Sequence, residues 1–278
     1  LYFFKNVSKI VTVSDGIKSS FVEILKIEEN RIIRIYNPFN LEEIQELSHQ
    51  SLNEYKDLFL FDVLISVGRL NNLKGQWYLI RIFNQLKQKY PNLKLIILGD
   101  GEMRDELISL SHNLGLSTFT IWGNEAFNPH FDIYFLGFQS NPFKFMKAAK
   151  LFVSTSLSEG FGNSIVESMI TQTPVVSSDC KSGPREILYP GRKKWFSTEC
   201  VLYNGYGVLL PPFNNKILGE RERLDDIEKL WIVTLEELLK DKTKISSYSV
   251  KGAVRAKDFN VKTVMGEWEN LIDLVISQ

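Results

Sequence analysis

The sequence predicts an α/β fold in which helices cover both faces of a parallel β-sheet. Short runs of β-branched and aliphatic residues alternate with amphipathic stretches along almost the whole chain. These two periodicities are typical of strands and helices, respectively. The amphipathic stretches are long enough to form crossover helices, so successive strands are expected to lie parallel.

The expected strands are short, and most of them end at a turn signal. Lys-Ile-Val-Thr-Val at 9–13 is the first run, and Asn37-Pro38 ends the second. Gly68 and Gly137 each follow a later run directly. Strands are therefore expected at residues 9–13, 31–36, 63–67, 93–98, 133–136, 151–154, 174–177 and 207–210.

The expected helices lie between these strands and carry their own boundary signals. Ser14 is a suitable N-cap for a helix that runs to about Leu25, and Pro91 ends another. Helices are expected at residues 15–25, 75–90, 102–114, 142–149, 163–171, 224–239 and 264–276. The polar stretch 41–59 is also helical in tendency and is interpreted as a connection between two lobes. Aromatic residues in 117–131 follow no regular period, so this segment is interpreted as an inserted loop.

Composition excludes several classes of protein. Of the 278 residues, 44% are hydrophobic and 24% charged, which is typical of a soluble globular protein and not of a disordered or fibrous one. Lys+Arg and Asp+Glu both total 33, and this neutral balance argues against nucleic-acid binding. Neither an apolar run of about 18 residues nor a signal-peptide pattern is found, so a cytoplasmic protein is expected. The two cysteines are expected to be reduced, and the first residue, Leu1, suggests a fragment.

Two cations near the predicted strand 63–67 are candidates for binding an anion. In a parallel sheet of this kind, ligands bind beyond the carboxyl ends of the strands. Gly68-Arg69 ends this strand, and Lys74-Gly75 opens the next helix. Two cations beside the positive end of a helix suit a diphosphate. The alternative is that both are solvated surface side chains.

The segment 158–164 is the strongest local feature, because two glycines there precede a helix. Its sequence is Ser-Glu-Gly-Phe-Gly-Asn-Ser, and Glu167 follows Glu159 by eight positions. Glycines let backbone N–H groups approach a ligand, and a carboxylate accepts sugar hydroxyl groups. One glutamate would then hold a hexose and the other a ribose. The alternative makes Glu159 a helix-dipole partner and Glu167 an exposed helix residue.

The remaining candidates are weaker. Gly99-Asp100-Gly101 lacks the third glycine of a dinucleotide fingerprint and is interpreted as a tight turn, which argues against a Rossmann dehydrogenase. The three histidines share no ligand spacing, so no metal site is expected. The segment 182–186 is interpreted as a turn in which Arg185 is a further candidate anion contact.

The ordered set of these motifs resembles a known family, the group-1, family-4 retaining glycosyltransferases of the GT-B fold. Over residues 60–212 the matching pieces are Ser-Val-Gly-Arg-Leu at 66–70 with Lys74-Gly75, Ile-Leu-Gly-Asp-Gly at 97–101, Phe-Leu-Gly-Phe at 135–138, the segment 158–167 with its E-x7-E spacing, Pro-Val-Val-Ser at 174–177 and Gly-Pro-Arg-Glu-Ile-Leu at 183–188. The insertion 117–131 departs from the family pattern. A sugar phosphorylase shares the architecture, but the lysine site expected for pyridoxal phosphate is not found.

The resemblance implies a division of the chain into parts of two Rossmann-like lobes. Residues 1–40 would be a remnant of the N-terminal, acceptor-binding lobe, which is mostly absent, and 41–60 the connection between lobes. Residues 61–260 would be the lobe that binds the nucleotide sugar. Residues 261–278 would form the C-terminal helix that crosses back toward the N-terminal lobe.

The resemblance also implies a role for each site residue. Arg69 and Lys74 would bind the diphosphate and stabilise the leaving group, and with Glu159 they form the expected catalytic set. Glu159 would bind the hexose and Glu167 the ribose. The expected donor-binding residues are Gly68, Arg69, Lys74, Phe138 (which would meet the base through its backbone), Glu159, Gly160, Phe161, Gly162, Asn163, Ser164 and Glu167.

The implied function is a metal-independent hexosyltransferase (EC 2.4) without a cofactor. It would transfer a hexose or N-acetylhexosamine from a nucleotide sugar, expected to be UDP-linked, with retention of configuration. The acceptor would be a glycan or lipid-linked sugar in polysaccharide or lipopolysaccharide synthesis, and it would bind through the missing lobe. Whether the full-length enzyme also associates peripherally with the inner face of the membrane is left open. The fragment alone is expected to be inactive. The alternative is a lobe that binds the nucleotide sugar without transferring it.

Overall fold

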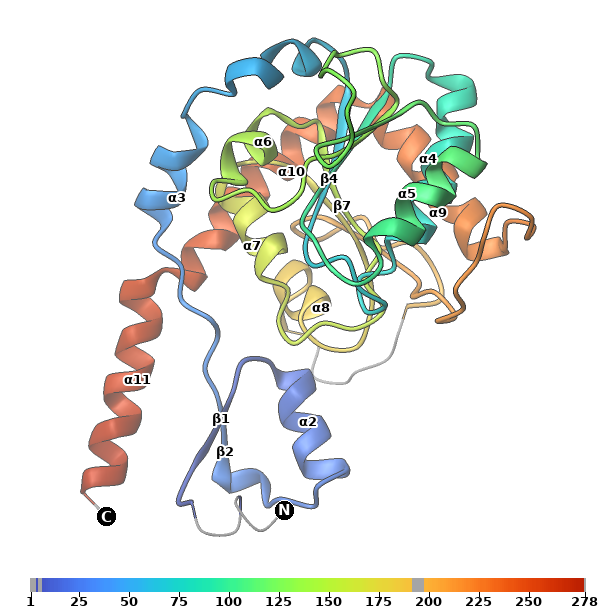
Figure 1. Cartoon of the computed structure of the whole chain (residues 1–278). Helices are drawn as coiled ribbons and strands as arrows, with labels where there is room; N and C mark the ends of the chain where they lie inside the picture. The colour runs from blue at the N-terminus through green and yellow to red at the C-terminus, as the bar shows by residue number, and fades with distance from the viewer. Residues whose placement is uncertain (1–3, 5–6, 192–197, 278) are drawn as a thin grey trace.

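The protein consists of a large α/β body and a small unit beneath it (Figure 1). The structure, a computed structural model, describes residue 4 and residues 7–191 and 198–277. Outside the described residues therefore lie 1–3, 5–6 and 278, which belong to the first and last predicted segments, and 192–197, which belong to the predicted donor-binding segment 61–260. The body is built on a seven-stranded sheet of order β5-β6-β4-β3-β7-β8-β9, and every neighbouring pair in it is parallel. The predicted α/β fold class is confirmed.

The strands agree closely with those expected from the sequence, apart from β5. In the small unit, β1 pairs in parallel with β2. The strands are β1 Ile10–Thr12, β2 Ile32–Arg34, β3 Val63–Val67, β4 Lys94–Leu98, β5 Thr118–Thr120, β6 Ile133–Phe135, β7 Leu151–Ser154, β8 Val175–Ser178 and β9 Val208–Leu210.

Helices connect successive strands and continue beyond the last one. The α-helices are α2 Asp15–Glu23, α3 Leu41–Ser48, α4 Gln76–Lys89, α5 Arg104–Asn113, α6 Phe143–Ala148, α7 Asn163–Ile170, α8 Pro184–Leu188, α9 Asp226–Lys240, α10 Lys242–Ala256 and α11 Val261–Ile276. Short 3-10 helices span Glu29–Arg31, Asn53–Leu60 and Lys257–Phe259. Ser14 caps α2 as predicted, because its Oγ accepts the N–H of Ile17 at 3.2 Å.

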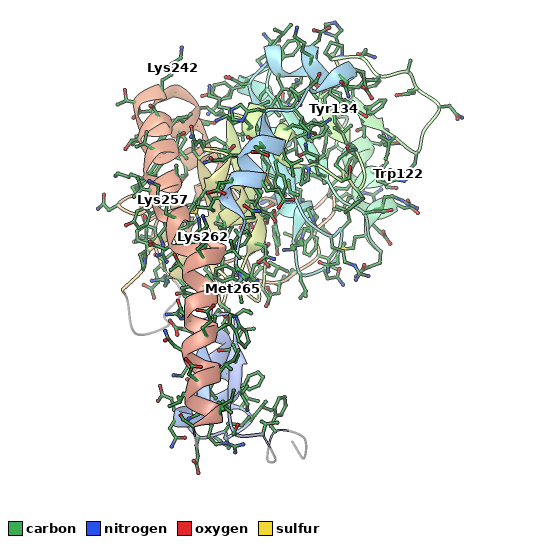
Figure 2. The ribbon with its side chains drawn as sticks, turned by 90° about the vertical axis from the view of Figure 1, so that its left-hand side faces the viewer. Trp122, Tyr134, Lys242, Lys257, Lys262 and Met265 are labelled. Carbon is green, nitrogen blue, oxygen red and sulfur yellow. The ribbon has the colours of Figure 1, made fainter. Side chains whose placement is uncertain are left out.

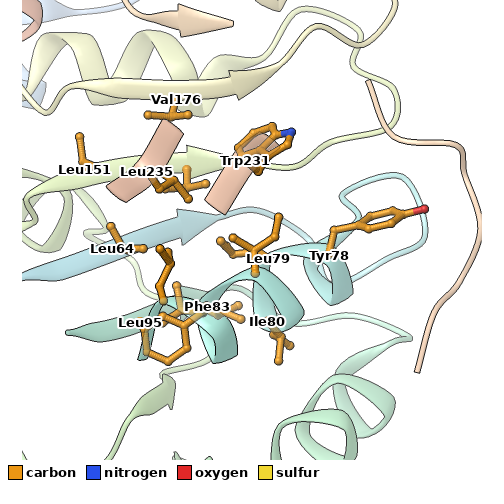
Figure 3. Packing of buried hydrophobic residues seen from close by; sticks show 14 of the residues in the cluster. Leu64, Tyr78, Leu79, Ile80, Phe83, Leu95, Leu151, Val176, Trp231 and Leu235 are labelled. Atoms are coloured by element: carbon orange, nitrogen blue, oxygen red, sulfur yellow. The ribbon is translucent and has the colours of Figure 1, made fainter. Parts of the chain in front are cut away.

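The two faces of the sheet form two separate hydrophobic layers. Alternate strand residues such as Leu64 and Leu95 pack with α4 and α9, where Phe83 and Trp231 are fully buried (Figure 3). The intervening residues, such as Ile65, pack on the other face with α6 and α7. Burial on both faces explains why the central strands are mostly apolar and do not alternate regularly between apolar and polar residues.

Three segments differ from the sequence prediction. The predicted loop 117–131 contains β5, a three-residue edge strand that is too short to show a period. The predicted turn 182–186 begins the short helix α8. Helix α10 was not expected, because Ser, Gly and β-branched residues lower its intrinsic propensity. It forms through packing: a Cβ on Gly252 would lie 3.3 Å from Cγ of Met169 in α7.

The chain passes twice between the body and the small unit, and the two passages lie side by side. The Phe39 N–H donates to the Phe259 carbonyl at 2.9 Å, and the Val261 N–H donates to the Phe39 carbonyl at 2.8 Å. Helix α11 then runs from Lys262 past Met265 to lie beside β1 and β2 (Figures 1 and 2). There Val264 and Leu271 pack with Ile35, and the partly buried side chains around them are those of Val11, Ile33 and Trp268. Among the described residues, no helix has the length and apolar character needed to cross a membrane.

Candidate functional site

The strand ends predicted to bear ligands meet at the carboxyl edge of the large sheet. The Gly68 N–H donates to the Leu98 carbonyl at 3.0 Å, and the Gly99 N–H donates to the Gly137 carbonyl at 2.8 Å. Glycine is required at Gly99: its φ is 134°, and a Cβ would lie 2.0 Å from the Gly68 carbonyl oxygen. The ends of β3, β4 and β6 thus form one continuous backbone surface.

Lys74 and Glu159, which sequence reasoning assigned separately, form an ion pair across this edge. The Lys74 Nζ lies 2.5 Å from Oε1 of Glu159, and the Ser156 hydroxyl donates to the same oxygen at 2.7 Å. The two side chains are 22% and 10% exposed. The Leu157 N–H donates to the Leu73 carbonyl at 2.8 Å and so ties the two loops together. A lysine and a carboxylate are therefore held together where the loops after β3 and β7 meet.

The Glu167 carboxyl group lies in α7 and is largely removed from water. Burial raises its pKa to about 7, and the nearby Lys74 ammonium only partly opposes that rise. Among the described residues, no hydrogen bond or ion pair engages this carboxyl group. The alternative interpretation of Glu167 as an exposed helix residue is therefore wrong.

The loop before α7 presents backbone rather than side chains. Gly162 is the N-cap with a φ of 100°, so it leaves the first N–H groups of α7 uncovered by a capping side chain. The Phe161 ring is buried against Tyr36, at 5.1 Å between centroids, so only its backbone can face a ligand. Asn163 accepts a hydrogen bond from the Asn37 side chain at 2.8 Å. Two further predicted site residues are Gly160, which is exposed in this loop, and Ser164, which is half-buried in the first turn of α7.

Arg69 and Phe138 lie at the same edge but are not joined to the Lys74–Glu159 pair. The Arg69 side chain is 70% exposed and contacts Glu102, with Nε 3.2 Å from Oε2. Phe138 follows Gly137 and is 79% exposed. Gly68 lies beneath Lys74, since a Cβ there would be 3.2 Å from the Lys74 Cε. Arg69 is thus an exposed cation at the same edge as the pair and is not part of it.

Sequence reasoning missed the part played by Glu186. Its carboxylate accepts the N–H of Asp15 at 2.7 Å and of Gly16 at 2.9 Å, and so joins α8 to the first turn of α2. Burial raises the pKa of this carboxyl group. A Cβ on Gly16 would lie 2.4 Å from Ser182 Oγ, so the contact requires glycine. The position of Glu186 at N3 of α8, just after Gly183-Pro184, was a usable sequence signal.

Arg185 lines a pocket whose lining residues include neither Lys74 nor Glu159. The Arg185 guanidinium pairs with the buried Asp179, so it already has an anionic partner inside the protein. A pocket of about 500 Å³ lies between α2 and α8, where Tyr36 and Tyr189 line it. Among the described residues, no cluster of His, Cys, Asp and Glu could hold a metal ion.

The seven-stranded parallel sheet flanked by helices matches the GT-B fold of solved glycosyltransferase structures. The profile of the family described as "Glycosyl transferases group 1" matches residues 45–200, which is more than half of the chain. The chain belongs to this family.

Three similar proteins illustrate the relationship. An uncharacterised glycosyltransferase of Methanocaldococcus jannaschii is 36% identical over 98% of this chain and 65% of its own length. The N-acetylgalactosamine-N,N'-diacetylbacillosaminyl-diphospho-undecaprenol 4-alpha-N-acetylgalactosaminyltransferase of Campylobacter jejuni is 34% identical over 64% of this chain and 43% of its own. The crystal structure of Anabaena HepE in complex with UDP and glucose superposes with a TM-score of 0.70 and 20% identity, over 96% of this chain and 63% of that one. The chain thus spans about two thirds or less of each of these relatives.

Proposed function

We propose that this chain is the donor-binding part of a retaining glycosyltransferase of the family-4 type. Its donor is a UDP-linked hexose or N-acetylhexosamine, and its acceptor is a glycan or a lipid-linked sugar. The observation that carries the proposal is the Lys74–Glu159 ion pair with the Glu167 carboxyl group beside it, at the ends of β3 and β7. A cation and two carboxyl groups match the anionic and hydroxyl-rich ends of a nucleotide sugar.

Each charge has a distinct role in this proposal. Lys74 and Arg69 bind the diphosphate and stabilise the negative charge that develops when it leaves. Among the described residues, both hydrogen bonds to the Glu159 carboxylate go to Oε1. Its Oε2 lone pairs are then available to accept hexose hydroxyl groups. Glu167 accepts the ribose hydroxyl groups.

The backbone completes the donor site. The Phe138 main chain meets the base, residues 160–163 line the hexose, and the Ser164 N–H in the first turn of α7 donates to a phosphate. In the reaction, the bond from the sugar C1 to the diphosphate oxygen breaks, and an acceptor hydroxyl oxygen bonds to C1 from the same face. The acceptor O–H bond breaks in this step, and its proton passes to the departing diphosphate oxygen. Because side-chain cations stabilise the leaving group, the proposal needs neither a metal ion nor a cofactor.

The small unit is part of the acceptor-binding lobe in this proposal. Residues 1–40 belong to that lobe, 41–60 connect the lobes, 61–260 bind the donor, and 261–278 cross back. Support comes from the two adjacent passages at Phe39 and Asn260, and from the packing of α11 on the β1–β2 unit. Because one relative is named for an undecaprenol-linked substrate, we place the whole protein in the cytoplasm, at the inner face of the membrane.

Calorimetric titration with UDP, UDP-hexoses, UDP-N-acetylhexosamines and NAD tests this function. We expect UDP and at least one UDP-sugar to bind and NAD not to bind. A transfer assay with the same donors then separates the enzyme from the alternative, a lobe that binds donor without transferring it. NAD binding without UDP binding would contradict the proposal.

A further inference from the structure

Trp122 lies at the carboxyl edge of the sheet, in the turn that follows the edge strand β5. The Ile121 N–H donates to the Phe135 carbonyl at 3.1 Å, and the Gly123 N–H donates to the Thr120 carbonyl at 3.2 Å. These bonds fix the turn on both sides of the indole. The Trp122 side chain is nevertheless 40% exposed. A large aromatic ring is thus held in place while much of its surface faces solvent, and Figure 2 shows it at the margin of the body.

The end of β6 is shaped to receive this turn. Gly137 has a φ of 63°, and a Cβ there would lie 2.3 Å from Cδ1 of Ile121 and 3.3 Å from Cζ2 of Trp122. Glycine therefore lets the indole edge approach the backbone where β6 ends. The next residue, Phe138, is 79% exposed and is the one whose main chain is proposed to meet the base.

Arg104 orients the indole from a second side. Its guanidinium carbon lies 4.8 Å from the centroid of the Trp122 ring, a cation–π distance. The same guanidinium group is tethered by Asp105 at 3.0 Å and by Asp100 at 3.5 Å. Asp100 follows β4, so the end of that strand indirectly positions Trp122. A ring oriented in this way loses little further freedom when a flat ligand stacks on it.

We infer that Trp122 is the stacking platform for the nucleotide base, an inference that rests on the proposed function. The sheet order β5-β6-β4-β3 separates the Trp122 turn from the Arg69–Lys74 loop by three strand spacings, about 14 Å. In the proposed site the base meets the Phe138 main chain at the end of β6, and β6 pairs with β5, so a base bound there lies about one strand spacing from the Trp122 turn. Stacking on an aromatic ring favours any base, so Trp122 supplies affinity rather than a choice among bases.

The test combines affinity with fluorescence in Trp122→Ala and Trp122→Phe. By calorimetry, Trp122→Ala should bind UDP roughly 5- to 150-fold more weakly, the range of base–aromatic stacking, whereas Trp122→Phe should stay near the unsubstituted protein. UDP should quench the tryptophan emission of the unsubstituted protein. That quenching should disappear in Trp122→Phe and persist in the matched control Trp268→Phe, whose ring packs in the distant α11 cluster. Thermal unfolding checks that each variant is folded.

The outcomes separate this inference from the function on which it rests. Unchanged UDP affinity in Trp122→Ala, equal losses in the Ala and Phe variants, or quenching that survives in Trp122→Phe would overturn the role of Trp122 alone. Absence of UDP binding by the unsubstituted protein would overturn the proposed function, and this inference with it.

Discussion

The Lys74 ammonium lies 2.5 Å from the Glu159 carboxylate, although 85 residues separate the two along the chain. The pair connects the turn after β3 to the loop after β7, two strands that are neighbours in the sheet. Both side chains are largely buried, so salt screens the attraction between them only weakly. A diphosphate that enters the site therefore meets a lysine already positioned by its partner.

Lys74→Ala should weaken UDP binding more than Arg69→Ala. Each lost charge-assisted contact should cost about 1.5–3 kcal/mol, roughly ten- to a hundredfold in affinity. Lys74 is positioned by Glu159, whereas the exposed Arg69 must be ordered on binding and should contribute toward the lower end of that range. Calorimetry with UDP measures both effects.

Lys150→Ala is the matched control for the loss of a paired lysine. Lys150 lies 2.6 Å from Asp62 at the opposite, amino edge of the sheet and should leave UDP affinity unchanged. Equal UDP affinities in all three variants and the unsubstituted protein would contradict the diphosphate assignment.

Glu167 should make stability fall as pH rises. Its pKa in the folded protein is about 7, above the ordinary value of 4.5, so the folded state holds the proton over a range where the unfolded state has lost it. The contribution of Glu167 to the free energy of unfolding is therefore greatest below pH 4.5. It declines by up to about 3 kcal/mol as the pH rises to about 7. Urea unfolding of the protein and of Glu167→Gln at pH 5 and 8 measures the difference. A difference independent of pH would refute the raised pKa.

Gly99→Ala should destabilise the carboxyl edge. The new Cβ would meet the Gly68 carbonyl oxygen at 2.0 Å at a φ of 134°, so the loss should exceed about 1 kcal/mol, and UDP affinity should fall with it. Gly266→Ala is the control, because a Cβ there meets nothing within 4 Å inside helix α11. That change should instead stabilise by about 0.5–1 kcal/mol. Denaturant unfolding of both variants checks these opposite signs.

Nucleotide binding should not depend on a divalent metal ion. In the proposed site, the positive charge opposite the diphosphate comes from Lys74 and Arg69. We expect equal UDP affinity in buffer with EDTA and in buffer with magnesium or manganese. If UDP affinity depended strongly on magnesium or manganese, a metal ion would neutralise the diphosphate charge. That result would contradict the proposal.

The sequence predicted the body of the fold because its strands are buried on both faces. Runs such as 63–67 and 151–154 are mostly apolar and bounded by glycine or by polar residues, so their positions were clear. Helix α10 and strand β5 were missed because tertiary contacts form them: Gly252 packs on Met169, and Thr118–Thr120 is ordered by pairing with β6.

In the site too, the local features could be predicted from the sequence, whereas the contacts between distant residues could not. The spacing of Glu159 and Glu167 was visible in the sequence, since both belong to one loop and the helix that follows it. The contacts of Glu159 with Lys74, and of Glu186 with the first turn of α2, join residues 85 and 170 or more positions apart. No local pattern encodes such contacts, because they arise only when the sheet order brings separate strand ends together.

Titration of Glu159→Ala and Glu167→Ala with both UDP and the UDP-sugar that the protein binds tests the central claim most directly. Glu167→Ala removes the ribose contact, so it should weaken both ligands by about 1.5–3 kcal/mol, roughly ten- to a hundredfold. Glu159→Ala removes the hexose contact. It also removes the partner that positions Lys74, but that carboxylate competes with the diphosphate for the same ammonium group, so the two effects offset each other. UDP should therefore bind nearly as before while the UDP-sugar loses its additional affinity. Equal losses of UDP affinity in the two variants, or no difference between UDP and the UDP-sugar in either, would contradict the assignment of the two glutamates to one nucleotide sugar.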